Sequence, residues 1–412
     1  MHIFLNALGA TCASGWTYVR NVIPHLSQRA DVRTTVLMKR QLRQGLTDSA
    51  NVSVLDIDPA ANAARRFWFE QTMIPGLIRK SGADVLVSAG NFALRSSPVP
   101  QILLSGNSLY TNSDFSRHLR ARRELGLWLD NRIKSCFARR SIHWADATVA
   151  PSRTFADELQ RWAGKEVVSI HHGFDRNVFF GDATPLPDPL QQKLDSPSNA
   201  LRLLFVSHYN YYRNFETLLR ALPIFRERLS GRKIRLFLTC QLRSKDNPGS
   251  FRAEEAAALV DRLGIREEVV QLGTIPYNLL HRVYKACDVY VTPAYAETFA
   301  HPLVEAMASG LPVVASDLPV HREICGQAAL YFRRFSPEEL SRQLLRVADS
   351  ADYRQQLAER GVIRSHDFSW AKHTDELLGL AATLVRTRTR SLETCVLASG
   401  TSRDVQAVSE VG

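Results

Sequence analysis

The fold of this chain is most constrained by an alternation of short apolar runs with amphipathic stretches, repeated on both sides of one break. Runs of aliphatic and β-branched residues predict buried strands, and the stretches between them have helical periodicity. Such alternation is typical of βαβ units, which build parallel sheets. In the first half the predicted strands are Ile3–Leu8, Thr34–Met38, Val85–Ser88, Gln101–Leu104 and Ala147–Ala150, and the predicted helices are Trp16–Arg29 and Ala121–Phe137.

The break is the segment 182–200, which is rich in Pro, Asp and Ser and is typical of a linker. Because 412 residues exceed one ordinary hydrophobic core, we predict an N-terminal domain over 1–182, a linker over 183–200 and a second domain over 201–367. A ligand is expected in the cleft between the domains, at the carboxyl ends of the strands. The second domain should contain strands Leu201–Val206, Ile234–Cys240, Val269–Leu272, Val289–Thr292 and Pro312–Ala315, with helices Phe215–Arg228, Phe251–Leu263, Asn278–Cys287 and Pro302–Ser309.

Composition limits the partners and the cellular compartment expected for the protein. The net charge of +11 suits an anionic partner, but it does not distinguish nucleic acid from acidic lipid or a phosphorylated substrate. Six scattered cysteines without a C-x-x-C pair indicate reduced thiols in a cytosolic protein. The apolar run His2–Leu8 is too short for a signal peptide, and no run is long enough for a transmembrane helix.

The segment from Glu297 to Gly310 gives the most direct indication of a ligand-binding or catalytic site. A loop with Glu297 follows a buried strand, and Pro302 and Gly310 fit the start and the C′ position of a short helix. The first turn of such a helix leaves backbone N–H groups free to bind an anion such as a diphosphate. Glu305, predicted on the same face as His301, can accept hydrogen bonds from vicinal hydroxyls. The alternative is an ordinary strand–helix crossover with two solvated glutamates.

The stretch 293–317 closely resembles the E-x7-E signature of the retaining glycosyltransferases of family four, which have the two-domain GT-B fold. Other segments are also similar to that family. These are A-P-S at 150–152, the turn H-G-F-D at 172–175 and F-S-W before a helix at 368–370. The resemblance therefore extends well beyond the signature itself.

The resemblance covers residues 1–385 and implies an α/β fold with two Rossmann-like domains that face a central cleft. It also implies that a C-terminal helix, 368–385, returns to the first domain. The tail 386–412 lacks sustained periodicity, and we expect it to be poorly ordered.

The resemblance assigns roles to the residues of the signature. It implies that Glu305 binds the donor ribose and that Glu297 is catalytic, contacting the donor sugar or lying beside the reacting centre. The backbone of Phe299, Ala300 and His301 would hold sugar hydroxyls and phosphate. These roles agree with what the chemistry of the residues allows.

The loop after the first strand of the second domain departs from the family pattern. Family members typically have a Gly there, often followed by Arg, and then Lys-Gly or Lys-Asn. Here Ser207 replaces the Gly, His208 stands where the Arg is often found, and Arg213-Asn214 replaces Lys-Asn. We predict that Arg213 is catalytic, because its permanent charge can stabilise a departing diphosphate. We also predict that Ser207 and His208 bind the donor, although the charge of His208 depends on pH. The alternative for Arg213 is a solvated loop arginine, and an alternative without donor contact stays open for His208 as well.

Three further residues are predicted at the cleft. Gly15 fits the second glycine of the family's donor-phosphate loop, although a lone glycine before a helix often serves packing alone. The segment around it is not a G-x-G-x-x-G fingerprint, so no dinucleotide cofactor is expected. Asn107, after a predicted strand, and His172, in the H-G-F-D turn, are predicted on the acceptor side.

The stretch 117–140 is strongly basic. It has eight Lys or Arg residues against two acids, Glu124 and Asp130, with large apolar residues interleaved. A basic amphipathic helix of this kind can lie on an anionic membrane, which would suit a lipid-linked acceptor. The alternative is a surface helix with a solvated basic face and a core-facing apolar stripe.

Together these features predict a retaining, metal-independent glycosyltransferase. It would move a hexosyl unit, with mannosyl as one candidate, from a nucleoside-diphosphate sugar to a glycan, lipid-linked or other acceptor in polysaccharide or glycoconjugate biosynthesis. We expect a cytoplasmic protein, peripheral at the inner face of the membrane, with no cofactor, no nucleic-acid partner and no D-x-D metal motif after a strand. The alternatives are a nucleotide-sugar-binding protein without transfer activity, suggested by Ser207 and His208, and a phosphorylase or epimerase on the same scaffold.

Overall fold

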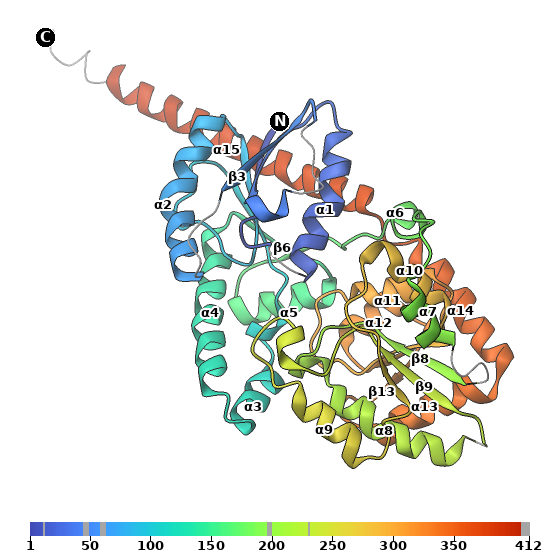
Figure 1. The fold of residues 1–412 in the computed structure, drawn as a ribbon. Helices are drawn as coiled ribbons and strands as arrows, with labels where there is room; N and C mark the ends of the chain where they lie inside the picture. Colours follow the sequence, from blue (N-terminus) through green and yellow to red (C-terminus); the bar gives the residue numbers. More distant parts are fainter. Residues whose placement is uncertain (11–12, 44–48, 58–62, 196–199, 230, 405–412) are drawn as a thin grey trace, which may run out of the picture.

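The computed structural model describes the whole chain except residues 11–12, 44–48, 58–62, 196–199, 230 and 405–412. For 13–14, 63 and 391–404 it describes the backbone alone. The chain forms two parallel β-sheets, each covered by helices, which lie side by side (Figure 1). We call the first sheet with its helices the N-domain and the second sheet with its helices the C-domain.

The N-domain sheet is parallel with the strand order β3-β2-β1-β4-β5-β6-β7. Its strands are β1 (His2–Asn6), β2 (Arg33–Lys39), β3 (Val52–Ile57), β4 (Val85–Ala89), β5 (Gln101–Leu104), β6 (Ala147–Ala150) and β7 (Val168–Ser169). Its helices are α1 (Ala13–Ser27), α2 (Ala63–Ser81), α3 (Ser113–Ala121), α4 (Leu125–Trp144) and α5 (Arg153–Ala163). Helices cover both faces, so a central strand such as β1 is buried at every position.

The C-domain sheet is also parallel, with the order β10-β9-β8-β11-β12-β13. Its strands are β8 (Leu201–Phe205), β9 (Ile234–Leu238), β10 (Val269–Gln271), β11 (Val289–Thr292), β12 (Val313–Ser316) and β13 (Ala329–Phe332). The helices from here to the C-terminus are α6 (Arg176–Phe180), α7 (Asp188–Asp195), α8 (Phe215–Arg228), α9 (Glu254–Arg262), α10 (Tyr277–Lys285), α11 (His301–Ala308), α12 (Pro319–Cys325), α13 (Pro337–Asp349), α14 (Ala351–Ser365) and α15 (Trp370–Asp404).

Two short pieces of secondary structure differ from the sequence-based prediction. The predicted linker contains the helix α7, because Leu194 packs into the C-domain core and Pro189 is compatible with a first helical turn. The predicted helix 121–137 begins instead at Leu125, because the chain reverses at Arg123, whose φ is 57°. Both features depend on tertiary packing, which local composition does not reveal.

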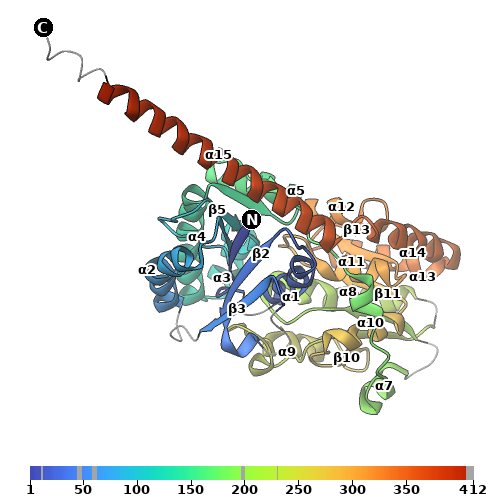
Figure 2. The ribbon, with the colours of Figure 1, turned by 90° about the horizontal axis from the view of Figure 1, so that it is seen from above.

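The C-terminal helix α15 packs on the N-domain, where Leu377 and Ala381 join the core beside Val22 of α1. In Figure 2 the helix crosses the top of the molecule and projects beyond it. The helix α15 continues to Asp404, through much of the segment after Arg386 that we expected to be poorly ordered. No Gly or Pro interrupts 386–399, so the packed first half of α15 can extend into solvent.

The two domains are joined at α5 by a polar contact. The carboxylate of Glu323, from α12 of the C-domain, accepts hydrogen bonds from the backbone N–H groups of Arg153 (2.8 Å) and Thr154 (2.7 Å). It also bonds His171 at 2.6 Å, and these hydrogen bonds hold the pKa of Glu323 down to about 2 despite its partial burial. An anion at a helix N-terminus is favoured by the unpaired N–H groups and by the dipole.

Two sequence-based expectations concern metal and membrane. A D-x-D motif does follow a strand, since Asp56 and Asp58 flank Ile57 at the end of β3; this corrects the assumption that none exists. Asp56 is paired with Arg40 and Arg43 at the sheet edge, and Asp58 lies outside the described residues. Among the described residues no helix is long and apolar enough to span a membrane.

Gly173 provides a test of the packing between the domains and α15. A Cβ atom at Gly173 would lie 2.0 Å from the backbone nitrogen of Trp370, which no side-chain movement can relieve. We expect Gly173→Ala to lower the free energy of unfolding by about 2 kcal/mol or more. Gly379→Ala in α15 is the control, because a Cβ atom at Gly379 would have no atom within 4 Å; it should stabilise by roughly 0.5–1 kcal/mol. Equal unfolding midpoints in urea for the two variants would contradict this account.

Candidate active site

The helix α11 begins and ends where local signals in the sequence indicate. Ala300 precedes it in the left-handed region with a φ of 65°, and Pro302 occupies its first turn. Gly310 follows it with a φ of +75°, a conformation that L side chains rarely adopt. The start of α11 lies beside the loop after β11, so its free N–H groups are directed to the edge of the sheet where ligands bind in parallel α/β folds.

Arg213 and Glu297 meet in an ion pair between two loops. Arg213 ends a one-turn 3-10 helix, Tyr211–Arg213, that follows β8, and Glu297 lies between β11 and α11. The guanidinium Nη1 contacts the carboxylate, and the two side chains are only 20% and 10% exposed. The structure therefore brings together the two residues that the sequence analysis predicted to be catalytic.

Backbone contacts hold these two loops against each other. The amide N–H of Tyr295 donates to the carbonyl of Tyr212 at 2.9 Å, and the side chain of Asn214 donates to the carbonyl of Pro293 at 3.0 Å. Asn214 itself is left-handed, with a φ of 56°. These bonds fix Arg213 and Glu297 at one end of the cleft, independently of their own attraction.

Two buried nitrogens beside this pair have no protein partner. They are Nε of Arg213 and Nδ1 of His208, neither of which is hydrogen-bonded within the described part of the chain. Burial and the neighbouring Arg213 lower the pKa of His208, so its imidazole is neutral at pH 7. Buried nitrogens left unpaired are costly, and an anionic ligand would satisfy Nε of Arg213.

Ser207 is turned toward its own loop. Its hydroxyl donates to the carbonyl of His208 at 2.7 Å, and its amide N–H donates to the hydroxyl of Thr239 at 3.0 Å. The hydroxyl thus stabilises the turn that carries His208. A direct contact between Ser207 and a donor stays a prediction.

Glu305 is buried in α11 beside residues that sequence analysis did not single out. Its carboxylate accepts a hydrogen bond from the hydroxyl of Tyr284 at 2.9 Å. Burial raises the pKa of Glu305 to about 7, against the lowering effects of Tyr284 and Arg20. Arg20, from α1 of the N-domain, lies over the ring of Tyr277 at 4.5 Å. An arginine within the mostly apolar stretch W-T-Y-V-R-N-V-I was the one sequence signal that could have marked this position.

His301 and His172 meet at the start of α11. Nδ1 of His172 lies 3.1 Å from Nε2 of His301, and the rings are stacked at 5.2 Å between centroids. Burial lowers the pKa of both, that of His301 to about 4, so both are neutral and one donates to the other. The ring of Phe299 packs against His172 at 5.5 Å. His172, predicted on the acceptor side, therefore lies beside the predicted donor residues Phe299 and His301.

A cavity of about 290 Å³ lies next to Glu297. Asn107, predicted on the acceptor side, accepts a hydrogen bond from the N–H of Leu109 at 3.1 Å and caps the turn beside this cavity, and its contact with an acceptor stays a prediction. The polar residues that line the cavity are Ser108, Thr111, Asn112, Ser113, Asp114, Thr154, Glu158, Arg161, Glu297 and Arg334. Hydroxyl, amide and charged groups of this kind suit a polyhydroxylated ligand better than an apolar one.

Two other elements bear on the cleft. Close packing explains why a glycine stands at position 15, because a Cβ atom there would lie 2.9 Å from Cα of Ala10. A contact between Gly15 and a donor stays a prediction. The hydroxyl of Ser152, which caps α5, donates to the carbonyl of Thr298 at 2.7 Å and so ties the N-domain to the loop of Glu297. Among the described residues no group of three His, Cys, Asp or Glu side chains is arranged to hold a metal ion.

The basic stretch 117–140 divides into two parts. Arg122 and Glu124, at the α3–α4 corner, contact the C-domain. On α4, the side chains of Leu125, Leu129 and Ile133 are 62%, 54% and 51% exposed and follow one helical face. In Figure 1, α4 lies on the side of the N-domain away from the C-domain.

Residues 188–364 match the family model described as glycosyl transferases group 1. The matched segment lies mostly in the C-domain and covers less than half of the chain. The chain is 26% identical over 221 residues to a D-inositol 3-phosphate glycosyltransferase of Corynebacterium aurimucosum, covering 52% of the chain and 51% of that protein. It is 31% identical over 121 residues to O-antigen chain mannosyltransferase B of Escherichia coli, covering 29% of the chain and 32% of that protein. The chain thus spans about half, or less, of the length of these curated relatives.

Solved structures support the GT-B fold over nearly the whole chain. Sucrose-phosphate synthase from Thermosynechococcus elongatus superposes with a TM-score of 0.74 at 17% identity, covering 94% of the chain and all of that protein. Anabaena HepE in complex with UDP and glucose gives a TM-score of 0.68 at 16% identity, covering 93% of the chain and all of that protein. The two parallel sheets of this chain are therefore the two halves of a GT-B fold, as the sequence predicted.

The raised pKa of Glu305 predicts a pH dependence of donor binding. If Glu305 binds the donor ribose as predicted from the sequence, the ribose hydroxyls would donate to its ionised carboxylate, and binding would favour the form that is lost as the pH falls below about 7. We expect the dissociation constant of a nucleoside-diphosphate sugar to fall roughly tenfold between about pH 6 and about pH 8. Isothermal titration calorimetry measures this change.

Glu305→Gln is the matched control for this measurement, because it keeps the shape of the side chain and removes the titration. The ligand must be the intact nucleoside-diphosphate sugar. A free nucleoside diphosphate is unsuitable, because its terminal phosphate itself titrates near pH 6. An unchanged pH dependence in the Gln variant would show that another group is responsible.

Proposed function

We propose that this protein transfers a hexosyl unit from a nucleoside-diphosphate sugar to a hydroxyl group of a glycan or lipid-linked acceptor. The observation that carries the proposal is the Arg213–Glu297 ion pair at the cleft, with Nε of Arg213 buried and unpaired among the residues that the structure describes. A diphosphate can accept hydrogen bonds both from this guanidinium and from the helix N-terminus. The family match over 188–364 supports the same chemistry.

In the proposed reaction the acceptor oxygen bonds to the anomeric carbon while the bond from that carbon to the diphosphate breaks. The acceptor proton passes to a phosphate oxygen of the leaving diphosphate. Arg213 stabilises the charge that develops there, and the fixed loop makes this stabilisation available without reorganisation. Retention of the anomeric configuration is proposed from the resemblance of 293–317 to retaining enzymes, and independence of a metal from the positive charge that Arg213 and α11 supply.

The remaining donor contacts follow from the positions of the side chains. Glu305 would accept hydrogen bonds from the ribose, with Tyr284 and Arg20 at the side of its carboxylate. His301 and His172 are neutral and can bond sugar hydroxyls. The similarity to a mannosyltransferase and to proteins named for inositol phosphate makes mannosyl and other hexosyl donors, and a polyol or glycan acceptor, the first to test.

The central prediction separates binding from transfer. Thermal-shift screening against UDP, GDP, ADP and dTDP sugars should reveal one donor that raises the unfolding temperature, because a ligand that binds only the folded state stabilises it. With that donor, Glu297→Ala should bind within a few-fold of the wild type and lose transfer. Arg213→Ala should lower kcat by roughly 100-fold or more, with partial recovery in Arg213→Lys.

The controls distinguish the remaining functions. A protein that binds a donor tightly but transfers nothing to a broad acceptor panel would be a binding protein instead. Phosphorolysis of a glycan, or epimerisation of the donor without an acceptor, would identify one of the other activities of this scaffold. A fully active Glu297→Ala variant would remove that residue from the mechanism.

We further propose that α4 holds the protein on an anionic membrane, where a lipid-linked acceptor would be presented. The support is the exposed stripe Leu125, Leu129 and Ile133, flanked by the exposed cations Arg132, Arg139 and Arg140 on the same helix. Apolar side chains can enter the acyl boundary while the cations contact anionic headgroups.

Vesicle sedimentation tests this second proposal. The protein should bind phosphatidylglycerol vesicles more tightly than phosphatidylcholine vesicles, and less tightly at high salt. The double variant Leu129→Glu/Ile133→Glu should lose roughly tenfold in affinity per residue. The control is Ile363→Glu on α14, which is 72% exposed in the C-domain and should change nothing. Equal binding of the two variants would contradict a role for α4.

A further inference from the structure

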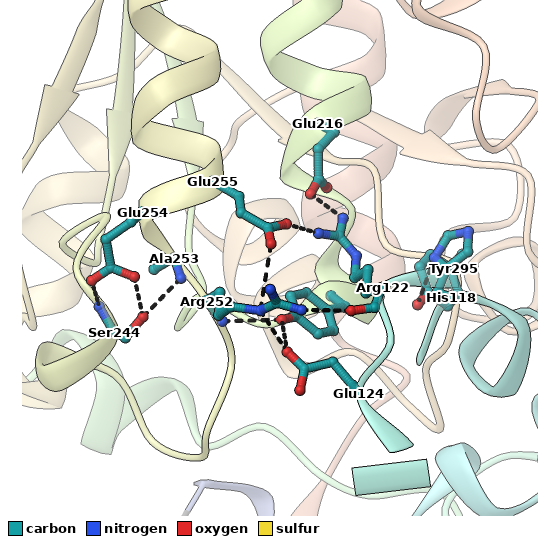
Figure 3. Close-up of polar contacts among 11 residues, drawn as sticks. His118, Arg122, Glu124, Glu216, Ser244, Arg252, Ala253, Glu254, Glu255 and Tyr295 are labelled. Carbon is teal, nitrogen blue, oxygen red and sulfur yellow. Dashed lines mark hydrogen bonds and ion pairs between the residues drawn. The ribbon is translucent and has the colours of Figure 1, made fainter. Parts of the chain in front are cut away.

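The corner between α3 and α4 reaches across from the N-domain to the C-domain. The chain turns sharply at Arg123, whose positive φ lets Arg122 and Glu124 both face the C-domain. Figure 3 shows Arg122 between Glu216 and Glu255, with Arg252 beside Glu124. We call this set, with Tyr211, the clasp. Its members are Arg122 and Glu124 of the N-domain and Tyr211, Glu216, Arg252 and Glu255 of the C-domain.

Arg122 is the centre of the clasp. Its guanidinium bonds Glu216 at 2.5 Å and also bonds Glu255, while its face lies over the ring of Tyr211 at 4.3 Å. The side chains of Arg122 and Glu216 are each only 22% exposed. A planar guanidinium can make two directed bonds and a ring contact at once, which an ammonium group cannot.

A second set of bonds closes the clasp from the other side. Arg252 bonds the carboxylate of Glu124 at 2.7 Å and the carbonyl of Arg122 at 2.6 Å. The hydroxyl of Tyr211 donates to the same carboxylate at 2.9 Å. The clasp therefore holds two cations and three carboxylates, and loss of Arg122 leaves Glu216 and Glu255 without their shared cation.

The clasp grips the same turn that carries Arg213. Tyr211 begins the 3-10 helix that Arg213 ends, and Glu216 lies in the first turn of α8 immediately after it. The helix α3 also touches the loop of Glu297. There the side chain of Asn112 donates to the carbonyl of Tyr295 at 3.3 Å, and Nδ1 of His118 lies 3.1 Å from the hydroxyl of Tyr295.

We propose that Arg122, through the clasp, is a positioning residue for the transfer reaction: when the N-domain is closed on the C-domain, it adds cross-domain bonds to the turn of Arg213, which bonds within the C-domain already hold against the loop of Glu297. The inference rests on the proposed function of Arg213. In the open protein the turn loses its cross-domain partners, so the diphosphate charge is fully stabilised only in the closed cleft. The same residues would therefore couple closure to catalysis. Hydrolysis of the donor would be disfavoured while the cleft is open to water.

Steady-state kinetics with the donor found by thermal shift tests this coupling. Arg122→Ala should lower kcat by roughly 10- to 100-fold, because small displacements of a charged group are costly to the reaction. The KM for the donor should change much less, since the donor is bound mainly by C-domain residues. Arg122→Lys should recover only part of kcat, because it restores the charge but not the planar geometry.

The decisive readout is a double-mutant cycle with Arg213. If Arg122 acts through Arg213, the double variant Arg122→Ala/Arg213→Ala should be no slower than Arg213→Ala alone. Losses that multiply would overturn the proposal and leave Arg122 a merely structural residue. Tyr211→Phe, which removes a single hydroxyl, serves if Arg122→Ala fails to fold, and should lower kcat several-fold without unfolding the protein.

The matched control is Arg226→Ala. Arg226 lies on α8, the helix that also carries Glu216 of the clasp. It pairs with Glu268 at 2.5 Å, but both residues belong to the C-domain and neither is in the clasp. This variant should leave kcat unchanged. The two proposals fail separately: an active Arg213→Ala variant would overturn the proposed function, whereas an inactive Arg213→Ala beside a fully active Arg122→Ala would overturn the clasp alone.

Discussion

The ion pair between Arg213 and Glu297 is the interaction on which the rest of the site depends. Both side chains are mostly withdrawn from solvent, so each charge needs the other, and further polar partners, to offset its desolvation. Those partners are incomplete in the protein alone, because Nε of Arg213 is buried and unpaired. A pair of this kind can hold two loops together while its unpaired guanidinium nitrogen can still donate to an anion. The backbone bonds from Tyr295 to Tyr212 and from Asn214 to Pro293 make the arrangement rigid.

The cleft is held from both domains. On one side Glu323 of the C-domain caps the start of α5, and Ser152 from the same helix end bonds the carbonyl of Thr298. On the other side the α3–α4 corner bonds α8 and α9 through Arg122 and Arg252. These contacts are polar, but α3 also packs Phe115 and Leu119 into the C-domain core.

The sequence predicted the bounds of the helix that carries Glu305, and the loop of Glu297 before it, because the signals there are local. Pro302 and Gly310 mark the ends of α11 by their own backbone preferences, and the spacing of Glu297 and Glu305 follows from them. Arg20 and Tyr284 were missed because their relevance arises only when α1 and α10 are brought beside α11. His172 was predicted on the acceptor side and lies against His301, since the path of the chain between the domains cannot be derived from a four-residue turn.

The sequence by itself determined the fold class, the two sheets and the bounds of α11, because alternating buried strands, amphipathic helices and Pro or Gly at helix ends are properties of neighbouring residues. Only the tertiary structure decided that Arg122 and Glu124, read as part of a basic surface, face the other domain, and that the last helix continues to Asp404. It also decided which nitrogens near Arg213 stay unpaired. Such facts depend on distances between residues far apart in the chain, and periodicity and composition carry no information about them.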